Sequence, residues 1–423
     1  MNLTRSTLTL ALLGALGMFA APAAHAQVAL DVIGDSEVTF EGLVQADMYW
    51  YDEDFAALSS DGADGSDSDY EMRRAELVLK GKGPGNIEWV AGYDAKADKW
   101  LDLNVKYKLG GNANNYFQVG QFKQLNSMEE LSSTKNNDFI SKSMVTNTWG
   151  IARRLGAMYN FGDNNWAIQA AFFTRELTEH PAPTPHGPGW GLRGYWAPIN
   201  EAGSIFHMGL SYNDYDTFMD TQQWRARPDA DLSNRIVDTG AMRNTDRIST
   251  IGLESFWVHG PFKLQGEYME SDTSRYSSPS DFGGSAGYLS ALWNVTGETW
   301  GYKNGTPTTP LPNEPASGMW QLGLRYDTID LNDGQLFPGA TPTSAPIVAG
   351  VLGGQMDTYT LGVNWYWRSN FKFMMNYVIA NSSRYIGKTS ATYAANPANN
   401  NHTFNAVIDD NPNILEARVQ FYW

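Results

Sequence analysis

Residues 414–423 read Ile-Leu-Glu-Ala-Arg-Val-Gln-Phe-Tyr-Trp. In an extended strand, successive side chains point to opposite faces of the sheet. One face of this stretch would therefore carry Leu415, Ala417, Val419, Phe421 and Trp423. The other face would carry Ile414, Glu416, Arg418, Gln420 and Tyr422. A strand with one apolar face and one largely polar face predicts a sheet that separates an apolar phase from water.

The same alternation with a period of two recurs along the chain in sixteen segments. They lie near residues 37–51, 70–82, 86–96, 100–109, 115–123, 150–161, 165–176, 189–198, 204–215, 247–258, 261–271, 285–297, 317–329, 355–367, 370–381 and 413–423. Most have about the length that a strand tilted across a bilayer needs, roughly 9–11 residues. An even number of strands is what a closed antiparallel barrel with both chain ends on one side requires. The pattern predicts an all-β fold, a sixteen-stranded antiparallel transmembrane β-barrel.

The links between these segments alternate between short and long. Short links such as 162–165 and 259–261 follow every second segment, whereas the others are long, as at 52–69, 124–149, 216–246, 330–354 and 382–412. Bacterial outer-membrane barrels have short periplasmic turns and long outer loops. Two links depart from this rule, because 298–316 is long and 97–99 is short. A secreted β-sandwich also alternates, but its apolar face would be mainly aliphatic. Here tryptophan recurs near segment ends, as in an interfacial girdle.

The first 26 residues have the features of a secretory signal. Arg5 is followed by the apolar run 8–21 and by Ala24-His25-Ala26, a small-x-small cleavage pattern. We therefore expect a cleaved signal peptide at 1–26 and a barrel at 27–423. No later run approaches 18 consecutive apolar residues, so no spanning helix is expected. The net charge of −16 and the absence of cysteine argue against a nucleic-acid partner and a thiolate metal site.

The polar faces of the segments predict a water-filled lumen. Positive side chains expected there include Lys106, Lys108, Arg154, Arg193 and Arg325, which would line the pore. They slightly outnumber the negative ones, so most of the acidic excess lies in the loops. Sixteen strands leave room for an aqueous channel, in which rings of Arg and Lys favour anions. The acidic run at 61–69 lacks the distal Glu of an EF-hand, but a calcium site there stays an alternative.

Several stretches resemble the phosphate-selective porins of the O and P family. They are 73–77 (RRAEL), 191–194 (GLRG) with 197–198 (AP), 207–210 (HMGL), 292–298 (LWNVTGE), 318–322 (GMWQL) and 360–366 (TLGVNWY). The resemblance spans nearly the whole chain after residue 26. It implies a trimeric porin of the bacterial outer membrane, with a constriction lined by arginines and lysines and no cofactor. Its partners would be phosphate or related small oxyanions, outer-membrane lipid and lipopolysaccharide.

The resemblance also assigns residues to the constriction. The paired arginines of the family match Arg73 and Arg74, and residues 121–142 match the loop that folds inward to narrow the pore. Strict alternation would place only one of the two arginines in the lumen. Either a bulge intervenes or the assignment of faces fails there. An arginine at the end of the loop falls at Lys142, and Lys135 matches the Ser/Lys stretch within it. Lys142 keeps the charge but lacks the bidentate fork of arginine.

Two positions depart from the family. A constriction tyrosine falls at Glu76, and a loop lysine falls at Glu130. At 4 Å and an effective dielectric constant near 20, two like charges repel by roughly 4 kcal/mol before screening. Glu76 beside the path would oppose phosphate unless Arg74 or another cation neutralises it. We therefore expect a passive, anion-preferring channel and keep a weakly selective or cation-tolerant porin as the alternative.

The sequence offers little for catalysis. The one Gly-x-Ser-x-Gly match, residues 283–287, runs into a predicted strand and is therefore no strand-turn-helix nucleophile elbow, and the chain contains no His-x-x-x-His pair. Of six histidines only His207 lies within a predicted strand, where a hydrogen-bonding role is the simpler interpretation. A barrel hydrolase or adhesin is the remaining alternative, and we expect no enzyme, no metal and no catalytic residue.

Overall fold

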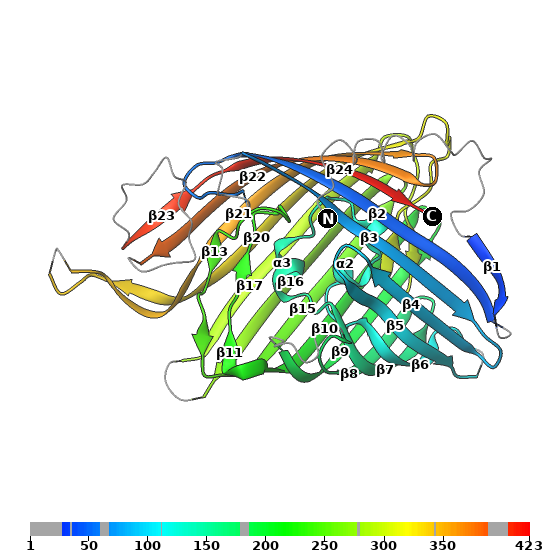
Figure 1. The fold of residues 1–423 in the computed structure, drawn as a ribbon, viewed down its shortest axis with the longest axis horizontal. Helices are drawn as coiled ribbons and strands as arrows, with labels where there is room; N and C mark the ends of the chain where they lie inside the picture. The colour runs from blue at the N-terminus through cyan, green and yellow to red at the C-terminus, as the bar shows by residue number, and fades with distance from the viewer. Residues whose placement is uncertain are drawn as a thin grey trace, which may run out of the picture.

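The computed structural model describes residues 28–33, 36–59, 67–110, 112–177, 186–276, 280–341, 344–387 and 405–423. Sixteen antiparallel strands form a closed barrel (Figure 1). They are β2 (Ser36–Asp52), β3 (Ser68–Lys82), β4 (Ile87–Asp94), β5 (Lys99–Lys108), β6 (Asn115–Lys123), β7 (Arg153–Asp163), β8 (Trp166–Phe173), β9 (His186–Glu201), β10 (Ser204–Thr217), β15 (Thr245–His259), β16 (Phe262–Arg275), β17 (Phe282–Asn294), β20 (Met319–Phe337), β21 (Ile347–Trp367), β22 (Phe371–Ile386) and β24 (Asn413–Tyr422). All sixteen predicted segments are strands of this barrel. Two short strands, β1 (Val28–Ile33) and β23 (Ala406–Asp410), extend the sheet at β2 and β22.

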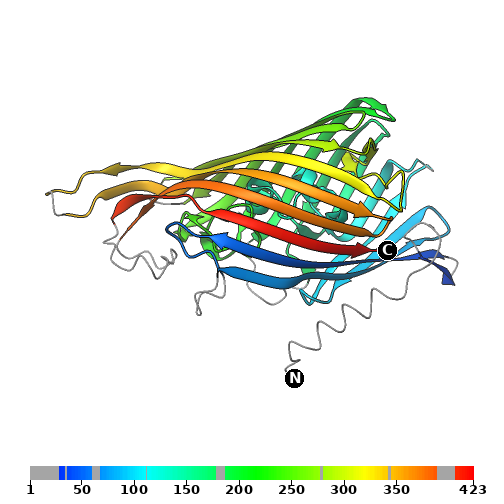
Figure 2. The same ribbon diagram turned by 90° about the horizontal axis from the view of Figure 1, so that it is seen from above.

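The last strand closes the barrel against the first. In Figure 2, β24 (red) lies between β2 (blue) and β22 (orange). The register pairs Asp47 with Arg418, and the guanidinium of Arg418 donates to the carboxylate of Asp47 at 2.6 and 2.7 Å. Val419, on the opposite face, is exposed. The two-faced strand predicted for residues 414–423 is confirmed.

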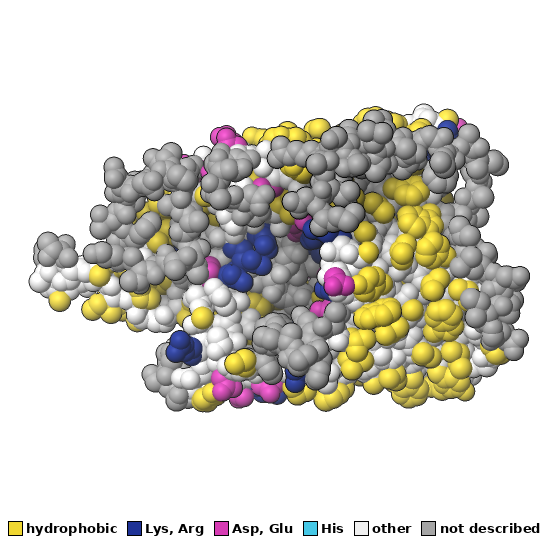
Figure 3. Space-filling view, viewed as in Figure 1, with side chains coloured by type: hydrophobic (Ala, Val, Ile, Leu, Met, Phe, Trp, Pro, Cys, Tyr) yellow, Lys and Arg dark blue, Asp and Glu magenta, His cyan; other side chains and the backbone are white. Residues whose placement is uncertain are grey.

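The outer surface of the barrel is apolar and rich in tryptophan. Exposed aromatic and aliphatic side chains lie on strands all round it, and the exposed tryptophans are Trp50, Trp100, Trp166, Trp190, Trp196, Trp257, Trp293 and Trp320. Hydrophobic side chains cover one end of the face shown in Figure 3. No described helix is long and apolar enough to cross a membrane. The predicted signal peptide lies outside the described residues, as do residues 61–66 of the acidic run.

Three connections fold into the lumen. The crossing loop, residues 124–152, holds α2 (Met128–Leu131), η1 (Thr134–Asn136) and α3 (Met144–Trp149). The upper loop, residues 218–244, holds η3 (Phe218–Asp220) and the short strands β11 (Thr221–Gln222), β12 (Arg225–Ala226), β13 (Val237–Asp238) and β14 (Met242–Arg243). The lower hairpin, residues 295–318, contains the link 298–316, which is longer than the predicted alternation of short and long links allows. It pairs β18 (Gly301–Lys303) with β19 (Thr306–Thr308).

The crossing loop and the upper loop pack against each other in a hydrophobic core inside the barrel. Trp149 and Trp224 meet edge to face, with ring centroids 6.1 Å apart and planes at 73°. Ile236 and Val237 of the upper loop are buried in the same core, beside Phe282 of the wall. Loops that bury this much apolar surface have fixed positions. The lumen therefore narrows between packed loops.

Candidate functional site

The two helices of the crossing loop are held at their N-termini by carboxylates of the barrel wall. The Glu267 carboxylate accepts hydrogen bonds from the backbone N–H groups of Met128 and Glu129, both at 2.8 Å. The Asp327 carboxylate accepts one from the N–H of Met144, also at 2.8 Å. The first N–H groups of a helix have no partner within it, and an anion there is favourable. These wall carboxylates therefore fix the loop and do not face the solvent.

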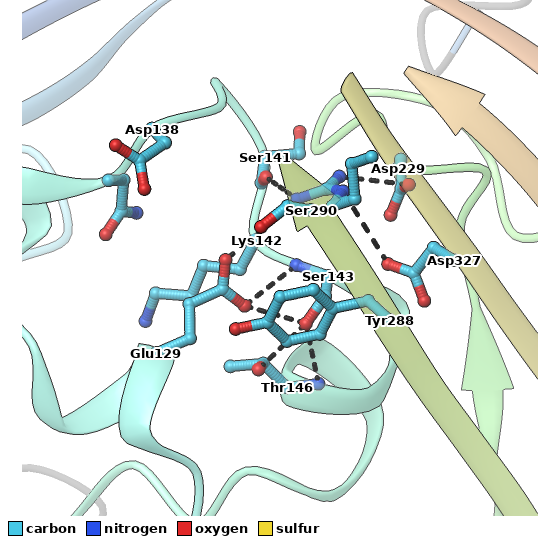
Figure 4. Close-up of polar contacts among 12 residues, drawn as sticks. Glu129, Asp138, Ser141, Lys142, Ser143, Thr146, Asp229, Tyr288, Ser290 and Asp327 are labelled. Carbon is cyan, nitrogen blue, oxygen red and sulfur yellow. Dashed lines mark hydrogen bonds and ion pairs between the residues drawn. The ribbon is translucent and has the colours of Figure 1, made fainter. Parts of the chain in front are cut away.

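Basic side chains of the wall hold the loop through its carbonyl groups. Arg325 donates to the carbonyl oxygen of Ser141 at 3.0 Å, and the carboxylates of Asp229 and Asp327 lie 2.9 and 3.8 Å from its guanidinium. Ser141, Asp229 and Asp327 lie close together in Figure 4. Arg418 donates to the carbonyl oxygen of Ile140 at 2.7 Å. Other wall contacts join Lys263 to Asp138, Asn364 to the carbonyl of Asp138, and Lys372 to the carbonyl of Asn137. The loop thus reaches from β6 and β7 across the lumen to the opposite wall.

The Phe139 ring explains two glycines of that wall, Gly323 and Gly362. A Cβ atom on Gly323 would lie 2.9 Å from the Phe139 ring, and one on Gly362 would lie 3.1 Å from it. These glycines pair across β20 and β21, so together they make a flat seat for the ring. The crossing loop approaches the wall closely only because both side chains are absent.

A bulge in β3 brings both predicted arginines to the lumen. The register with β2 shifts between Gln45, which pairs with Arg74, and Ala46, which pairs with Met72. Arg73 is the extra residue, and a bulge redirects the side chains beside it. Arg73 Nη2 lies 3.0 Å from the carboxylate of Asp231 in the upper loop. Arg74 Nη1 lies 3.2 Å from the Glu76 carboxylate.

Lys142 and Glu130 form an ion pair within the crossing loop. Lys123, at the end of β6, lies 3.7 Å from the same carboxylate. Burial raises the pKa of Glu130, but Lys142 and Lys123 outweigh burial and bring the pKa to about 2. Glu130 is therefore ionised at neutral pH, and its charge is balanced by two lysines.

A cavity of about 420 Å³ lies below the crossing loop, between it, the lower hairpin and the inner wall of β2–β9. Its charged lining includes three carboxylates, Glu41, Glu76 and Asp102. It also includes seven cations, Lys80, Lys106, Lys123, Lys135, Arg153, Arg193 and Lys303. Two of the carboxylates are already paired with cations of this lining, Glu41 with Lys80 at 2.5 Å and Asp102 with Arg153 at 2.8 Å. The cavity therefore has a positive excess.

Three lysines of this cavity form no ion pair within the described part of the chain: Lys106, Lys135 and Lys303. Lys106 lies 4.8 Å from the centre of the Tyr116 ring, and Lys135 lies 5.7 Å from that of Tyr422. Burial lowers the pKa of Lys135; Lys303 also lowers it, while Glu41 raises it. Lysines from the loop and from the lower hairpin thus face one space.

A second cationic group lies in the upper loop, above the constriction. Burial lowers the pKa of Arg235 to about 10, and Arg227 and Arg225 lower it further through repulsion. Burial also lowers the pKa of Arg227, where Arg73 and Arg225 add to the effect and Asp231 opposes it. Like charges interact in this way only when they are close. In Figure 3, Lys and Arg side chains gather in a hollow near the middle of the face shown.

Comparison with known proteins identifies this arrangement. The sequence model of a family described as "Phosphate-selective porin O and P" matches residues 44–423. The chain belongs to that family. It is therefore an outer-membrane channel and not an enzyme.

Two curated relatives resemble this porin. Porin O of Pseudomonas aeruginosa is 23% identical over 394 residues, covering 83% of this chain and 84% of that one. An uncharacterised protein of Caulobacter vibrioides is 25% identical over 330 residues, covering 73% of this chain. The match spans 62% of the length of the Caulobacter protein.

Solved structures share the fold of the porin. OmpT of Vibrio cholerae has a TM-score of 0.53 at 12% identity, covering 94% of this chain and 100% of that one. The anion-selective porin from Comamonas acidovorans has a TM-score of 0.53 at 14% identity, covering 92% and 100%. At these identities the likeness extends to the barrel alone.

The structure brings some of the predicted site residues of the porin together. Arg73, Arg74 and Glu76 meet on β3, and Lys142 meets Glu130 in the crossing loop. Lys106 and Lys135 line the lower cavity. Lys108 pairs with Glu88 at 2.6 Å, away from the constriction. Arg154 donates to the carbonyl of Arg153, and Arg153 lines the lower cavity.

Arg193 and Arg325, which were expected to line the pore, are almost fully buried. Each side chain is 1% exposed. Arg193 pairs with Glu254 at 2.5 Å and donates to the carbonyl of Gly305, so it fixes the lower hairpin. His207 also bonds Glu254, and its other ring nitrogen meets Tyr302 at 3.0 Å. These residues hold the wall and the hairpin together.

Sequence reasoning missed the arginines of the upper loop and Lys303 of the lower hairpin. Arg225, Arg227 and Arg235 lie within twelve residues of one another, between acidic neighbours, which hides them in a charge count. The close spacing of these three arginines within one long loop was the signal from which a cationic group could have been predicted. Among the described residues, no group of three or more His, Asp and Glu side chains could hold a metal ion.

Proposed function

We propose that this porin passes small anions, with phosphate or a related oxyanion as the favoured permeant. The observation that carries the proposal is the cationic lining on both sides of the crossing loop. Three arginines lie above it, and below it the cavity is lined by three lysines, Lys106, Lys135 and Lys303, that form no ion pair within the described part of the chain. Rings of Arg and Lys in a narrow, low-dielectric passage favour anions, because each anion loses water and gains charge-assisted contacts.

Several features of the constriction support an oxyanion. Guanidinium groups offer planar pairs of N–H donors that match two oxygens of one anion, and Arg73 and Arg74 stand side by side. Ser133, Thr134 and Lys135 of the crossing loop line the cavity just below. Binding has to stay weak enough for release, so the channel would be passive. The family to which the chain belongs is described as phosphate-selective, and one relative bears the name Porin O.

Titration of inorganic phosphate into a chloride current tests this proposal. The purified porin would be inserted into a planar bilayer in KCl, and the single-channel current recorded as phosphate is added. An oxyanion that binds in the passage occupies it, so the chloride current should fall and saturate. Sulfate at the same ionic strength shows whether a related divalent oxyanion occupies the passage as phosphate does. A chloride current that phosphate leaves unchanged would contradict the proposal.

We also infer that the porin is a homotrimer. A solved structure of Vibrio cholerae OmpT in a trimer form has a TM-score of 0.52 to this chain at 12% identity. The barrel exposes apolar side chains on the short strands β4 and β5, including Ile87, Trp100, Val105 and Tyr107. Symmetric assembly would cover part of this surface. Cross-linking in detergent, followed by denaturing gels, should give a ladder that ends at three copies.

A further inference from the structure

Three of the four cations that the family resemblance assigns to the constriction, all except Lys135, are each paired with a carboxylate of this chain. Arg73 pairs with Asp231, Arg74 with Glu76, and Lys142 with Glu130. The first pair differs from the other two because its carboxylate comes from a separate element, the upper loop. The Arg73 guanidinium directs both Nε and Nη2 at one oxygen of Asp231, at 3.3 and 3.0 Å. That edge is the one an oxyanion would otherwise take.

We propose that Asp231 is an internal counter-anion, which occupies the anion-binding edge of Arg73 and weakens the binding of permeant oxyanions. The inference rests on the proposed anion channel and refines it. The pore would pass phosphate-like anions with low affinity, because a permeant has to displace a tethered carboxylate. A tethered group competes at a high effective concentration.

The pair is accessible, unlike the structural ion pairs nearby. The side chains of Arg73 and Asp231 are 30% and 17% exposed, whereas those of Arg325 and Asp229 are 1% and 0% exposed. Burial raises the pKa of the Asp231 carboxyl, but Arg73 and Arg418 lower it below its ordinary value. Asp231 is therefore charged at neutral pH while it faces the lumen.

The position of the upper loop does not depend on Asp231. Two residues earlier, Asp229 is buried and binds Arg325 at 2.9 Å and the Thr358 hydroxyl at 2.6 Å. The Trp224 indole donates to the Thr273 hydroxyl of the wall at 3.0 Å. The Asp231 backbone N–H donates to Ser141 Oγ, a contact that a side-chain substitution leaves in place. The loop should therefore stay docked when the Asp231 carboxylate is removed.

The test compares D231N with D220N, which removes a carboxylate from the exposed part of the same loop. Asp220 accepts a hydrogen bond from the Tyr276 hydroxyl and does not touch Arg73. Both variants change the net charge equally. In planar bilayers with KCl, the phosphate concentration that halves the chloride current should fall about tenfold in D231N, or ~1.4 kcal/mol. In D220N it should stay within about twofold of the wild type.

Measuring D231N in an R73Q background shows whether its effect acts through Arg73 or through the general electrostatic field of the pore. In R73Q, the further change D231N should shift the half-inhibiting phosphate concentration by less than about twofold, because the two side chains act as a unit. The variant D231S should shift it in the same direction as D231N, should D231N fail to insert. Equal values for D231N and D220N, or an undiminished shift in R73Q, would overturn the role of Asp231. Phosphate that inhibits neither the wild type nor D231N would instead overturn the anion channel itself.

Discussion

The guanidinium of Arg325 donates to the carbonyl oxygen of Ser141, joining the wall of the barrel to the loop that crosses it. Both groups are buried, and Asp229 binds the same guanidinium from the upper loop. One arginine thus holds two inward-folded loops. A cation with this many internal partners is a support for the constriction and is closed to permeating ions.

Replacing Arg325 should loosen the constriction. R325M leaves Asp229 and Asp327 without their cation, and removal of one partner of a buried pair costs about 3–5 kcal/mol. We expect a lower unfolding temperature, measured as the temperature at which the heat-modifiable mobility on gels is lost. We also expect noisier and larger single-channel currents. Arg368, which lies over the Trp367 ring at a turn, provides the matched control R368M. Quiet currents of normal size in R325M would show that the loop has other sufficient anchors.

We expect replacement of Arg73 to change ion selectivity and replacement of Arg193 to change the stability of the barrel. R73Q removes a lumen cation and should lower the chloride-to-potassium permeability ratio several-fold, with little change in unfolding temperature. R193Q breaks a buried pair with Glu254 and should lower the unfolding temperature, with the ratio changed by less than about twofold. Reversal potentials and thermal gel shifts on both variants measure these effects. A changed permeability ratio in R193Q, with an unchanged ratio in R73Q, would contradict these roles and place the ion path beside Arg193.

The unpaired lysines of the lower cavity should carry part of the anion preference. K135E and K303E each change the charge of the cavity by two units, without breaking an ion pair seen among the described residues. We expect each to lower the chloride-to-potassium permeability ratio, and the double variant to lower it further. K82E, at the end of β3 and outside the cavity lining, serves as the control. Unchanged reversal potentials in the double variant would exclude this cavity from the path.

Acid should release the crossing loop only well below neutral pH. The pKa of Glu130 is lowered from 4.5 to about 2, so the ion pair with Lys142 stabilises the fold above pH 4.5. That stabilisation is lost as the pH falls from 4.5 towards 2, because the proton then competes with the lysines. Recording single-channel noise over this range should show an onset below pH 4.5 in the wild type. In E130Q the same noise should be present at neutral pH.

The seam of the barrel depends on a glycine. The indole of Trp423 lies over Gly42 of β2, where a Cβ atom would be 2.1 Å from the ring. G42V should therefore displace Trp423 and reduce the yield of folded barrel in the outer membrane, whereas V44A on the same strand should not. Counting folded and unfolded bands on unheated gels measures this. Equal yields would mean that the terminal aromatic is dispensable for closure.

The barrel was predictable from the sequence because the alternation of polar and apolar side chains is set within each strand. Alternation of side chains along each strand is set by the pleat, and residues such as Val419 and Arg418 report their faces directly. The site was less predictable, because it is made by contacts between distant loops. Arg73 and Arg74 were assigned by resemblance, but the bulge that turns both inward depends on the register with β2. Nothing in the sequence near Arg325 shows that Asp229 and Ser141 will enclose it. For the lower hairpin, the sequence indicated only a link of unusual length and did not predict that it folds into the lumen.

The reversal potential of single wild-type channels under a KCl gradient tests the central claim most directly. The cationic linings above and below the crossing loop predict a potential whose sign reports chloride as the more permeant ion. Because Asp231, Glu76 and Glu130 balance the constriction, the preference should be moderate and should weaken as salt screens the lining. A potential of the opposite sign, with potassium more permeant, would contradict the account.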